Sequence, residues 1–398
     1  MIAIVMMRIV TAKTMTNKEK GLHGSPLFLP ENKGLYIHIP FCRQKCRYCD
    51  FVSFSGKEEF QKRYLDALET ELTHYRHTPI DTIFIGGGTP TCLSDSLLDR
   101  LLSIIHSTFS LSEQNEFSIE ANPGTLTKEN IHILSDHGVN RVSVGVQSFC
   151  DAELRLLGRI HTADEAKRTI AALQDAGIEN VNIDLMSALP NQTPDALYQN
   201  LSEAISCRPA HISCYSLIIE EGTPFAADYE KGELTLPDDD TDRLMYHMAC
   251  NILAENGYNQ YEISNFARHG YECRHNIRYW RCLEYIGCGV AAHSYLNGAR
   301  YFHTSNLNSY LQNPCEVKER VVLSNKDKIQ EFMIMGLRMT DGVNETEFLN
   351  RFGIPLKKCY GPTLKKFTDN GLLLYQNGHY LLSERGIDIS NSVLCEFV

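Results

Sequence analysis

The chain has 398 residues, of which 43% are hydrophobic and 22% charged, and this composition excludes a disordered chain, a collagen and a coiled-coil rod. Its 38 Lys and Arg residues are outnumbered by 49 Asp and Glu residues, so a net charge of −11 argues against a nucleic-acid partner. No run of about 18 apolar residues occurs, so no transmembrane segment is expected.

The 14 cysteines do not form the pattern of a disulfide framework, because the chain is long and lacks a secretory signal. We therefore expect a cytoplasmic, reducing location, where cysteine serves as buried apolar filler or as a soft metal ligand. Residues 1–33 are expected to form a disordered N-terminal extension, with Met15 as an alternative start.

From residue 34 onward, short β-branched runs alternate with longer amphipathic runs. Strand–helix repeats of about 25–45 residues predict parallel strands joined by crossover helices, in a full or partial barrel or a doubly wound sheet. In each of these folds the functional site lies at the carboxyl ends of the strands. Strands are predicted at 35–39, 82–85, 116–120, 141–146, 181–186 and 211–217, and helices at 58–76, 94–108, 127–137, 162–176 and 194–206.

After residue 237 the regular alternation of strands and helices ends. Residues 237–257 predict one more helix, and residues 258–322 are irregular and rich in Tyr, His, Cys and Asn. From residue 323 onward, three predicted helices precede two short strands that flank Asn377-Gly378, a strong hairpin signal. This order predicts a small winged-helix-like α+β domain, and its balanced charge favours a packing or lid role over binding to nucleic acid.

Three cysteines follow the first predicted strand on one loop: Cys42, Cys46 and Cys49, with C-x3-C-x2-C spacing. A structural zinc site needs four ligands, and no fourth Cys or His stands nearby at a suitable spacing. An iron–sulfur cluster normally has four thiolates, so three thiolates leave one iron open to an outside ligand, such as the amino and carboxylate groups of S-adenosylmethionine. The triplet favours such a cluster over three free thiols or a partial zinc site.

Polar or glycine-rich segments also follow the next predicted strands. Three successive glycines, ending at Gly88, remove every Cβ and let backbone amides approach a ligand closely. Glu120, Gln147 and Asp184 end later strands, and the guanidinium of Arg159 suits a bidentate carboxylate contact. Each residue alone has an ordinary structural explanation, but their position on successive strand ends indicates one common site.

With these motifs the chain resembles the radical S-adenosylmethionine superfamily, and within it the branch of oxygen-independent coproporphyrinogen III oxidase, over roughly residues 34–395. The resemblance implies an α/β fold with a partial, TIM-like (β/α) barrel. It also implies that Cys42, Cys46 and Cys49 hold a [4Fe-4S] cluster, from which one electron splits S-adenosylmethionine to give a 5′-deoxyadenosyl radical. The residues expected to bind S-adenosylmethionine are Tyr36, Tyr48, Gly87, Gly88, Thr89, Glu120, Gln147, Arg159 and Asp184.

Two features distinguish groups within this branch. The oxidases have a fourth cysteine two positions after the triplet, where this chain has Phe51. Residues 275–280 resemble the His-Asn-x-x-Tyr-Trp motif of the heme chaperones in the branch, so His275, Asn276, Tyr279 and Trp280 are expected to contact heme. Imidazole is a common axial heme ligand and aromatic rings suit a porphyrin face. The axial ligand itself stays open, with these nearby alternatives: Cys273, Cys282, His293 and His303.

The resemblance therefore favours a heme chaperone that holds a cluster and S-adenosylmethionine and transfers heme to an acceptor protein. The alternative is coproporphyrinogen III oxidase activity, the radical decarboxylation of porphyrinogen propionates, and a third possibility is a radical enzyme with another substrate. The expected partners are heme, the acceptor protein, an electron donor such as flavodoxin or ferredoxin, and a second copy in a homodimer. The expected domains are a barrel over 34–300, a linker over 301–322 and the winged-helix-like domain over 323–398.

Overall fold

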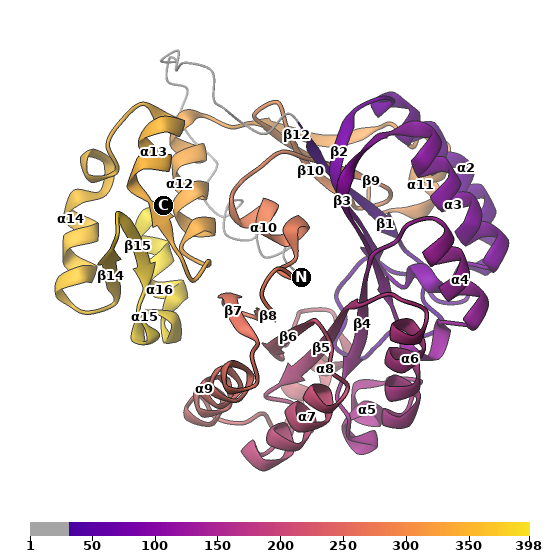
Figure 1. Ribbon diagram of the computed structural model, residues 1–398, viewed down its shortest axis with the longest axis horizontal. Helices are drawn as coiled ribbons and strands as arrows, with labels where there is room; N and C mark the ends of the chain where they lie inside the picture. Colours follow the sequence, from indigo (N-terminus) through magenta and orange to yellow (C-terminus); the bar gives the residue numbers. More distant parts are fainter. Residues whose placement is uncertain (1–31) are drawn as a thin grey trace.

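A computed structural model describes residues 32–398 of the chain (Figure 1). The expected extension over residues 1–33 falls almost wholly on residues 1–31, which lie outside the described part. No helix of the described part has the length and apolar character needed to cross a bilayer.

Six parallel strands form the wall of an open barrel, and they are neighbours in chain order. A doubly wound sheet reverses its strand order, so this arrangement is the partial (β/α) barrel that the resemblance implied. The strands are β1 (Lys33–Ile39), β2 (Pro79–Gly87), β3 (Ser110–Ala121), β4 (Arg141–Gln147), β5 (Asn180–Ser187) and β6 (His211–Ser216).

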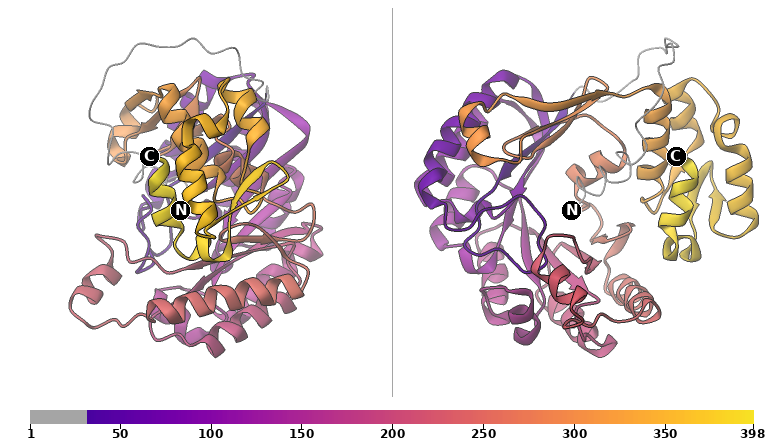
Figure 2. Two further views of the ribbon diagram at one scale, coloured as in Figure 1. Left: turned by 90° about the vertical axis from the view of Figure 1, so that its left-hand side faces the viewer. Right: turned by 180° about the vertical axis from the view of Figure 1, so that it is seen from behind.

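Helices cover the outer face of this wall (Figures 1 and 2). Two of them begin with capping boxes, in which Thr127 and Thr162 exchange hydrogen bonds with the third residue of the helix. The outer helices are α2 (Gln61–Leu72), α3 (Asp95–Thr108), α4 (Lys128–Asp136), α5 (Asp151–Leu157), α6 (Ala163–Asp175) and α7 (Pro194–Ser206).

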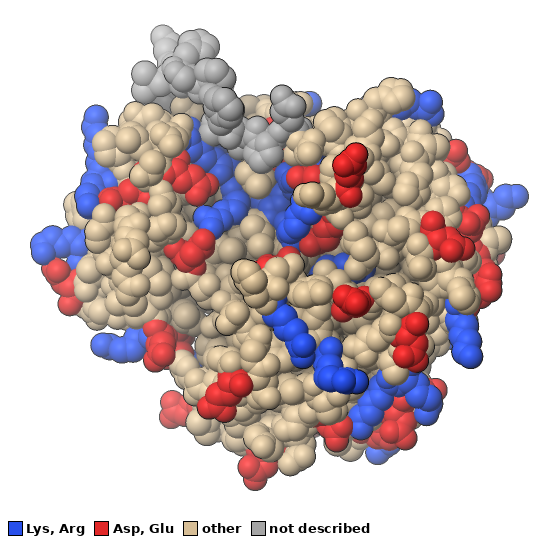
Figure 3. Space-filling model, in the orientation of Figure 1, with Lys and Arg blue, Asp and Glu red and all other residues tan. Residues whose placement is uncertain are grey.

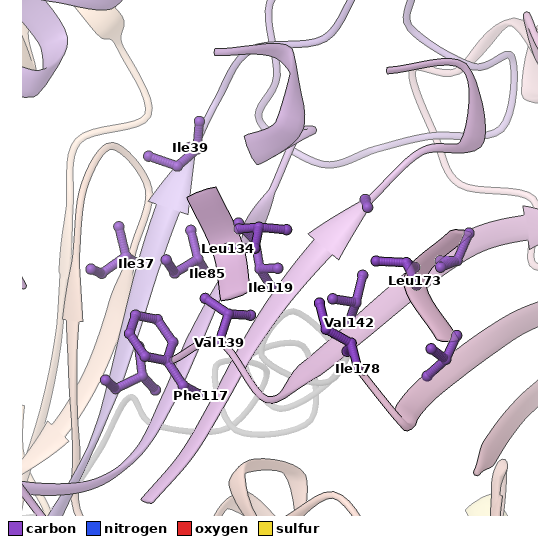
Figure 4. Close-up of a cluster of buried hydrophobic side chains, with 14 of the residues drawn as sticks. Ile37, Ile39, Ile85, Phe117, Ile119, Leu134, Val139, Val142, Leu173 and Ile178 are labelled. Carbon is purple, nitrogen blue, oxygen red and sulfur yellow. The ribbon is translucent and has the colours of Figure 1, made fainter. Parts of the chain in front are cut away.

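The hydrophobic core lies between the strands and these helices. Figure 4 shows Ile37, Ile85, Ile119 and Val142 of the strands packed near Leu134 and Leu173 of the helices. Successive side chains of a strand point to opposite faces, so the residues between these positions point into the barrel. The interior is therefore left to polar groups, and these groups form the candidate site.

The segment expected to be irregular supplies both ends of the sheet. Two short strands extend the sheet beyond β6, and four extend it on the other side of β1, which gives twelve strands in one sheet. The structure thus differs from the expected linker at 301–322, because this segment pairs with the sheet. The elements are α8 (Pro224–Glu230), α9 (Asp239–Glu255), β7 (Asn259–Glu262), β8 (Asn265–Ala267), α10 (Arg274–Trp280), β9 (Tyr285–Cys288), β10 (His293–Leu296), β11 (Ala299–His303), α11 (Leu307–Gln312) and β12 (Val317–Val322).

Helix α10 closes the end of the barrel where the parallel strands begin. The carboxylate of Glu116, on β3, accepts hydrogen bonds from the backbone N–H groups of Arg274 and His275 at 2.7 and 3.0 Å. The guanidinium of Arg278 forms an ion pair with Asp81, on β2. The barrel therefore has a closed end at α10 and an open end at the carboxyl termini of its strands.

The C-terminal unit lies across the open side of the barrel wall (Figure 1). Its small sheet has the order β13-β15-β14, and Asn377 and Gly378 form the expected turn, both with positive φ. The face in Figure 3 carries interspersed acidic and basic side chains. The elements are α12 (Asn325–Gly336), β13 (Val343–Asn344), α13 (Glu345–Phe352), α14 (Leu356–Asp369), β14 (Leu373–Gln376), β15 (His379–Leu382), α15 (Glu384–Asp388) and α16 (Ser390–Leu394).

A buried ion pair joins this unit to the sheet. Arg300 on β11 donates two hydrogen bonds of 2.8 Å to the carboxylate of Glu331 on α12, which is 3% exposed. We expect Glu331→Gln to lower the free energy of unfolding by about 3 kcal/mol, because it leaves a buried guanidinium without its charge partner. Thermal unfolding measures the effect, and Asp369→Asn, in the exposed Lys365–Asp369 pair, is the control. Equal stability of the two variants would contradict the prediction.

Candidate functional site

A cavity opens at the carboxyl ends of the barrel strands, with a volume of about 1070 Å³ including the solvent at its mouth. The loop that follows β1 forms one side of the cavity, and the ends of β2 to β6 form the remainder. This is the location that the alternation of strands and helices predicted for a functional site.

The loop after β1 is fixed to the barrel by main-chain and side-chain contacts. It folds back on itself, since Cys42 N–H donates to Phe54 C=O at 3.0 Å. Arg47 N–H donates to Leu157 C=O at 3.1 Å, and the Arg47 guanidinium forms an ion pair with Asp228. The loop therefore presents its cysteines from a defined position.

The thiols of Cys42, Cys46 and Cys49 all line the cavity. Cys42 Sγ lies 3.6 Å from Thr89 Oγ1, and Arg159 donates a hydrogen bond to Cys46 Sγ at 3.3 Å. Burial raises the pKa of the Cys49 thiol to about 11, with a further contribution from the neighbouring thiols. The three cysteines therefore share one cavity.

This donor set fits a cluster better than a single metal ion. Among the described residues, no three His, Cys, Asp or Glu side chains surround one point closely enough to hold a single ion. Thiolate is the ligand type of iron–sulfur clusters, and three thiolates around a cavity leave room for a larger group with one position open. Three thiols that line one cavity are the donor set that the sequence predicted for a cluster.

A glycine-rich strand end lies directly against the cysteine loop. A Cβ atom at Gly88 would lie 2.7 Å from the carbonyl oxygen of Phe41, and one at Gly87 would lie 2.5 Å from the His38 ring. Gly87 also has a φ of 108°, which a residue with a side chain adopts only under strain. Glycine at these two positions therefore lets the strand end approach the cysteine loop.

Two carboxylates face the cavity from β3 and β5. Glu120 accepts a hydrogen bond from Gly87 N–H at 3.0 Å, and Asp184 accepts from Ser143 Oγ at 3.1 Å and from Asn182 Nδ2 at 2.8 Å. Burial raises the pKa of Glu120 to about 7, and the charge of Asp184 contributes to the shift. Burial likewise raises the pKa of Asp184. Such buried carboxylates are suited to a cationic or hydroxyl-bearing ligand.

Arg159 and Gln147 complete the polar lining. The Arg159 guanidinium bonds to Asn122 Oδ1 and to the carbonyl oxygen of Gly145. Gln147 ends β4 with a φ of 71°, and its Oε1 accepts a hydrogen bond from Tyr215 Oη at 3.0 Å. The site thus contains a cation and hydrogen-bonding amides in addition to the two carboxylates.

The structure brings eight of the nine residues expected to bind S-adenosylmethionine to this cavity: Tyr48, Gly87, Gly88, Thr89, Glu120, Gln147, Arg159 and Asp184. Tyr36 is the exception and does not line it. Its hydroxyl lies 3.0 Å from His38 Nδ1, and His38 Nε2 lies 2.8 Å from the carbonyl oxygen of Val52 in the cysteine loop. Tyr36 therefore reaches the loop through His38.

Among the lining residues that sequence reasoning missed, three form hydrogen bonds with predicted site residues. Asn122 donates to Thr89 Oγ1 at 2.7 Å, and it stands only two positions after Glu120. Ser143 and Tyr215 lie on the inward faces of β4 and β6. The alternation of side chains along a strand is the signal that could have identified Ser143 and Tyr215, since every second residue of a strand faces the interior.

The residues expected to contact heme lie at the opposite, closed end of the barrel, on α10. His275 is fully buried, with Nδ1 3.0 Å from Thr82 Oγ1 and Nε2 2.9 Å from Tyr279 Oη. Its ring stacks on Phe84, and burial lowers its pKa to about 3. Tyr279 and Trp280 are also buried. In this arrangement both ring nitrogens of His275 have protein partners.

Comparisons with known proteins agree with these observations. The Radical SAM superfamily profile matches residues 36–203, and the HemN C-terminal domain profile matches residues 323–389. A solved structure of coproporphyrinogen III oxidase (HemN) from Escherichia coli has a TM-score of 0.81 at 23% identity, covering 92% of this chain and 90% of that chain. This match confirms the predicted fold.

Relatives named Heme chaperone HemW align over most of their length. The protein of Lactococcus lactis subsp. lactis (strain IL1403) is 38% identical, covering 93% of this chain and 98% of the relative. The protein of Bacillus subtilis (strain 168) is 36% identical, covering 92% and 99%, and that of Escherichia coli (strain K12) is 35% identical, covering 90% and 96%. The chain therefore belongs to the HemW family of the radical SAM superfamily.

Proposed function

We propose that this chain is a heme chaperone, which binds heme and delivers it to an acceptor protein. The observation that carries the proposal is the 35–38% sequence identity between this chain and three proteins named heme chaperones. The alignments cover 96–99% of the length of those proteins. Phe51 supports it, because this residue stands where the oxidases of the branch have a fourth cysteine. Phe51 lines the cavity beside the three thiols and supplies no ligand atom from its side chain.

Membership of the radical SAM superfamily implies a [4Fe-4S] cluster and S-adenosylmethionine as cofactors. We propose that Cys42, Cys46 and Cys49 hold the cluster, since their thiols share one cavity wall. When bound, the cluster supplies the electron for cleavage of the sulfonium bond of S-adenosylmethionine.

The other cavity residues orient S-adenosylmethionine in this proposal. The strand end at Gly87 and Gly88 lines the cavity and offers its backbone to the methionine part, and Arg159 offers a guanidinium for the carboxylate. Asp184 accepts hydrogen bonds from ribose hydroxyls. Glu120 offers a negative charge to the cationic groups of the cosubstrate, and the remaining contacts come from Tyr48, Thr89 and Gln147.

Contact between heme and the motif on α10 requires a rearrangement. His275 Nε2 faces Tyr279 Oη, and Trp280 is 2% exposed, so α10 must leave the end of the barrel before His275 can ligate iron. The proposal therefore includes a heme-loaded state in which α10 is displaced and His275, Asn276, Tyr279 and Trp280 contact the porphyrin.

The remaining partners follow from this chemistry. A one-electron donor such as flavodoxin or ferredoxin reduces the cluster, and an acceptor protein receives the heme. We also propose a reducing, cytoplasmic location, which is supported by 14 free cysteines in the described part of the chain. A homodimer belongs to the same proposal, and size-exclusion chromatography with and without heme tests it.

The proposal is tested by comparing heme uptake with oxidase activity in anaerobically reconstituted protein. Titration with heme is expected to saturate at a defined stoichiometry. Incubation with S-adenosylmethionine, a reductant and coproporphyrinogen III is expected to give no protoporphyrinogen. Product formed over many turnovers would overturn the chaperone assignment, as would failure to bind heme.

Delivery requires a separate kinetic measurement. Heme-loaded protein is mixed with an apo-hemoprotein, and the heme absorption band reports the transfer. Direct transfer gives a rate that rises with acceptor concentration, whereas passive release gives a rate that does not depend on it. The second result would contradict delivery by contact.

A further inference from the structure

Arg278 anchors α10 to the closed end of the barrel, where three neighbouring strands begin. Its guanidinium forms an ion pair with Asp81 on β2, and the Arg278 side chain is 5% exposed. Its Nη1 donates to the carbonyl oxygens of Asn32 at 3.3 Å and Glu284 at 3.2 Å, which stand just before β1 and β9. A Cβ atom at Gly34 would lie 2.6 Å from Arg278 Cδ, so glycine leaves room for this side chain. Arg278 therefore lies across β9, β1 and β2, which are adjacent in the sheet.

Thr82, the neighbour of Asp81 on β2, links Arg278 to the proposed heme motif. Its Oγ1 accepts a hydrogen bond from Arg278 Nε at 3.3 Å and lies 3.0 Å from His275 Nδ1. His275 and Arg278 are three positions apart, so they lie on the same face of the helix, toward the barrel. A displacement of α10 that frees His275 from β2 therefore also breaks the Asp81–Arg278 pair.

The ion pairs at the other end of α10 are of a different kind. Arg281 follows the last residue of the helix and pairs with Asp341 and Glu347, whose side chains are 50% and 39% exposed. In contrast, the side chain of Asp81 is 16% exposed. An exposed ion pair contributes little to stability, whereas a buried cation without its partner is strongly destabilising. The Asp81–Arg278 pair is therefore the ion pair that favours the closed arrangement most.

We infer that the Asp81–Arg278 ion pair is a latch, which keeps α10 closed over the barrel until heme binds. The inference rests on the proposed function, because it takes the motif on α10 as the heme contact. In the closed state Arg278 is buried and needs the charge of Asp81, whereas displacement of α10 returns both side chains to water. Removal of the Asp81 charge therefore destabilises the closed state more than the open state. Because apparent affinity scales with the fraction of binding-competent protein, a weaker latch gives tighter heme binding.

The first test is heme affinity in Asp81→Asn, which keeps the shape of the side chain and removes its charge. We expect the apparent dissociation constant for heme to fall about tenfold relative to the wild-type protein. The effect is limited because Arg278 retains its three other acceptors. Absorbance titration with heme under anaerobic conditions measures it. Weaker or unchanged heme binding by Asp81→Asn would overturn the inference.

Hydrogen exchange in the absence of heme tests the latch without its ligand. The N–H groups of Arg274 and His275 donate to the carboxylate of Glu116 on β3, so displacement of α10 exposes them to solvent. They are expected to exchange about tenfold faster in Asp81→Asn, while the N–H groups of β4 stay protected on that time scale. Unchanged exchange at α10 would overturn the inference. Equal exchange rates in α10 and β4 would show global unfolding and would also overturn it.

Asp341→Asn is the matched control, because it removes the same charge from the exposed pair at the other end of α10. It should change heme affinity and hydrogen exchange by less than about threefold. Arg278→Gln, which removes the other partner of the latch, replaces Asp81→Asn if the latter does not fold. Failure of both to fold would assign the pair to folding and overturn the inference.

The two measurements separate the latch from the proposed function. Failure of the wild-type protein to bind heme would refute the proposed function. Faster exchange of the α10 N–H groups in Asp81→Asn would still show that the ion pair holds the helix closed.

Discussion

Replacement of Cys42, Cys46 or Cys49 by serine is expected to prevent reconstitution of a [4Fe-4S] cluster, so that the protein lacks its absorbance and its iron. Each change removes one of the three thiolates that line the cavity, and a serine hydroxyl is a poor ligand for iron in such a cluster. The measurement is iron and sulfide content per chain together with the visible spectrum under anaerobic conditions. We expect a loss of nearly all cluster in each single variant.

Cys92→Ser is the matched control. This thiol lies close enough to Cys42 for their charges to interact, yet it is not part of the triplet and does not line the cavity. It should keep the cluster. Retention of the cluster in all three triplet variants would refute the ligand assignment, and its loss in Cys92→Ser alone would point to a different ligand set.

His275→Ala is expected to lower the free energy of unfolding by about 3 kcal/mol in the absence of heme. The change opens a cavity beside Phe84, leaves the buried hydroxyl of Tyr279 without a partner, and removes one of the two partners of the Thr82 hydroxyl. Denaturant unfolding of the heme-free protein measures the loss. Weaker heme binding by this variant therefore cannot by itself identify His275 as the axial ligand.

The exposed His269, six residues earlier, provides the control. His269→Ala should leave the stability unchanged, because the side chain is in contact with solvent. If His275→Ala had wild-type stability, the buried arrangement at α10 would be wrong. In that case, loss of heme binding would support direct ligation.

Local spacing was sufficient to predict the parallel strands and the cysteine triplet, and the family resemblance supplied the partial barrel and most of the other site residues. Each of these features lies within a short stretch of sequence: the six strand–helix repeats, the cysteine triplet and the strand-end residues from Gly87 to Asp184. The comparison with a solved structure confirms the fold. The C-terminal hairpin could also be predicted from local sequence, because Asn377-Gly378 specifies its turn.

The closed end of the barrel could not be predicted in this way. Strands β8 to β10 have only three or four residues each, and β9 pairs with β1, about 250 positions earlier in the chain. Such short segments have little periodicity, and tertiary pairing decides their structure. The burial of Arg141, at the start of β4, escaped prediction for a related reason, since arginine at the start of a strand is ordinarily exposed. Only closure of the barrel places it inside.

The position of α10 has a consequence for any attempt to isolate the part of the chain that the Radical SAM profile matches. The stretch matched by the Radical SAM profile, residues 36–203, lacks both β9 and the helix that seals the strand beginnings. Excision of that stretch would expose Glu116, Arg141 and Ser118 to bulk water, although all three are buried in the whole chain. The recognisable sequence unit is therefore smaller than the autonomous folding unit, and a truncated fragment is a poor substitute for the whole chain.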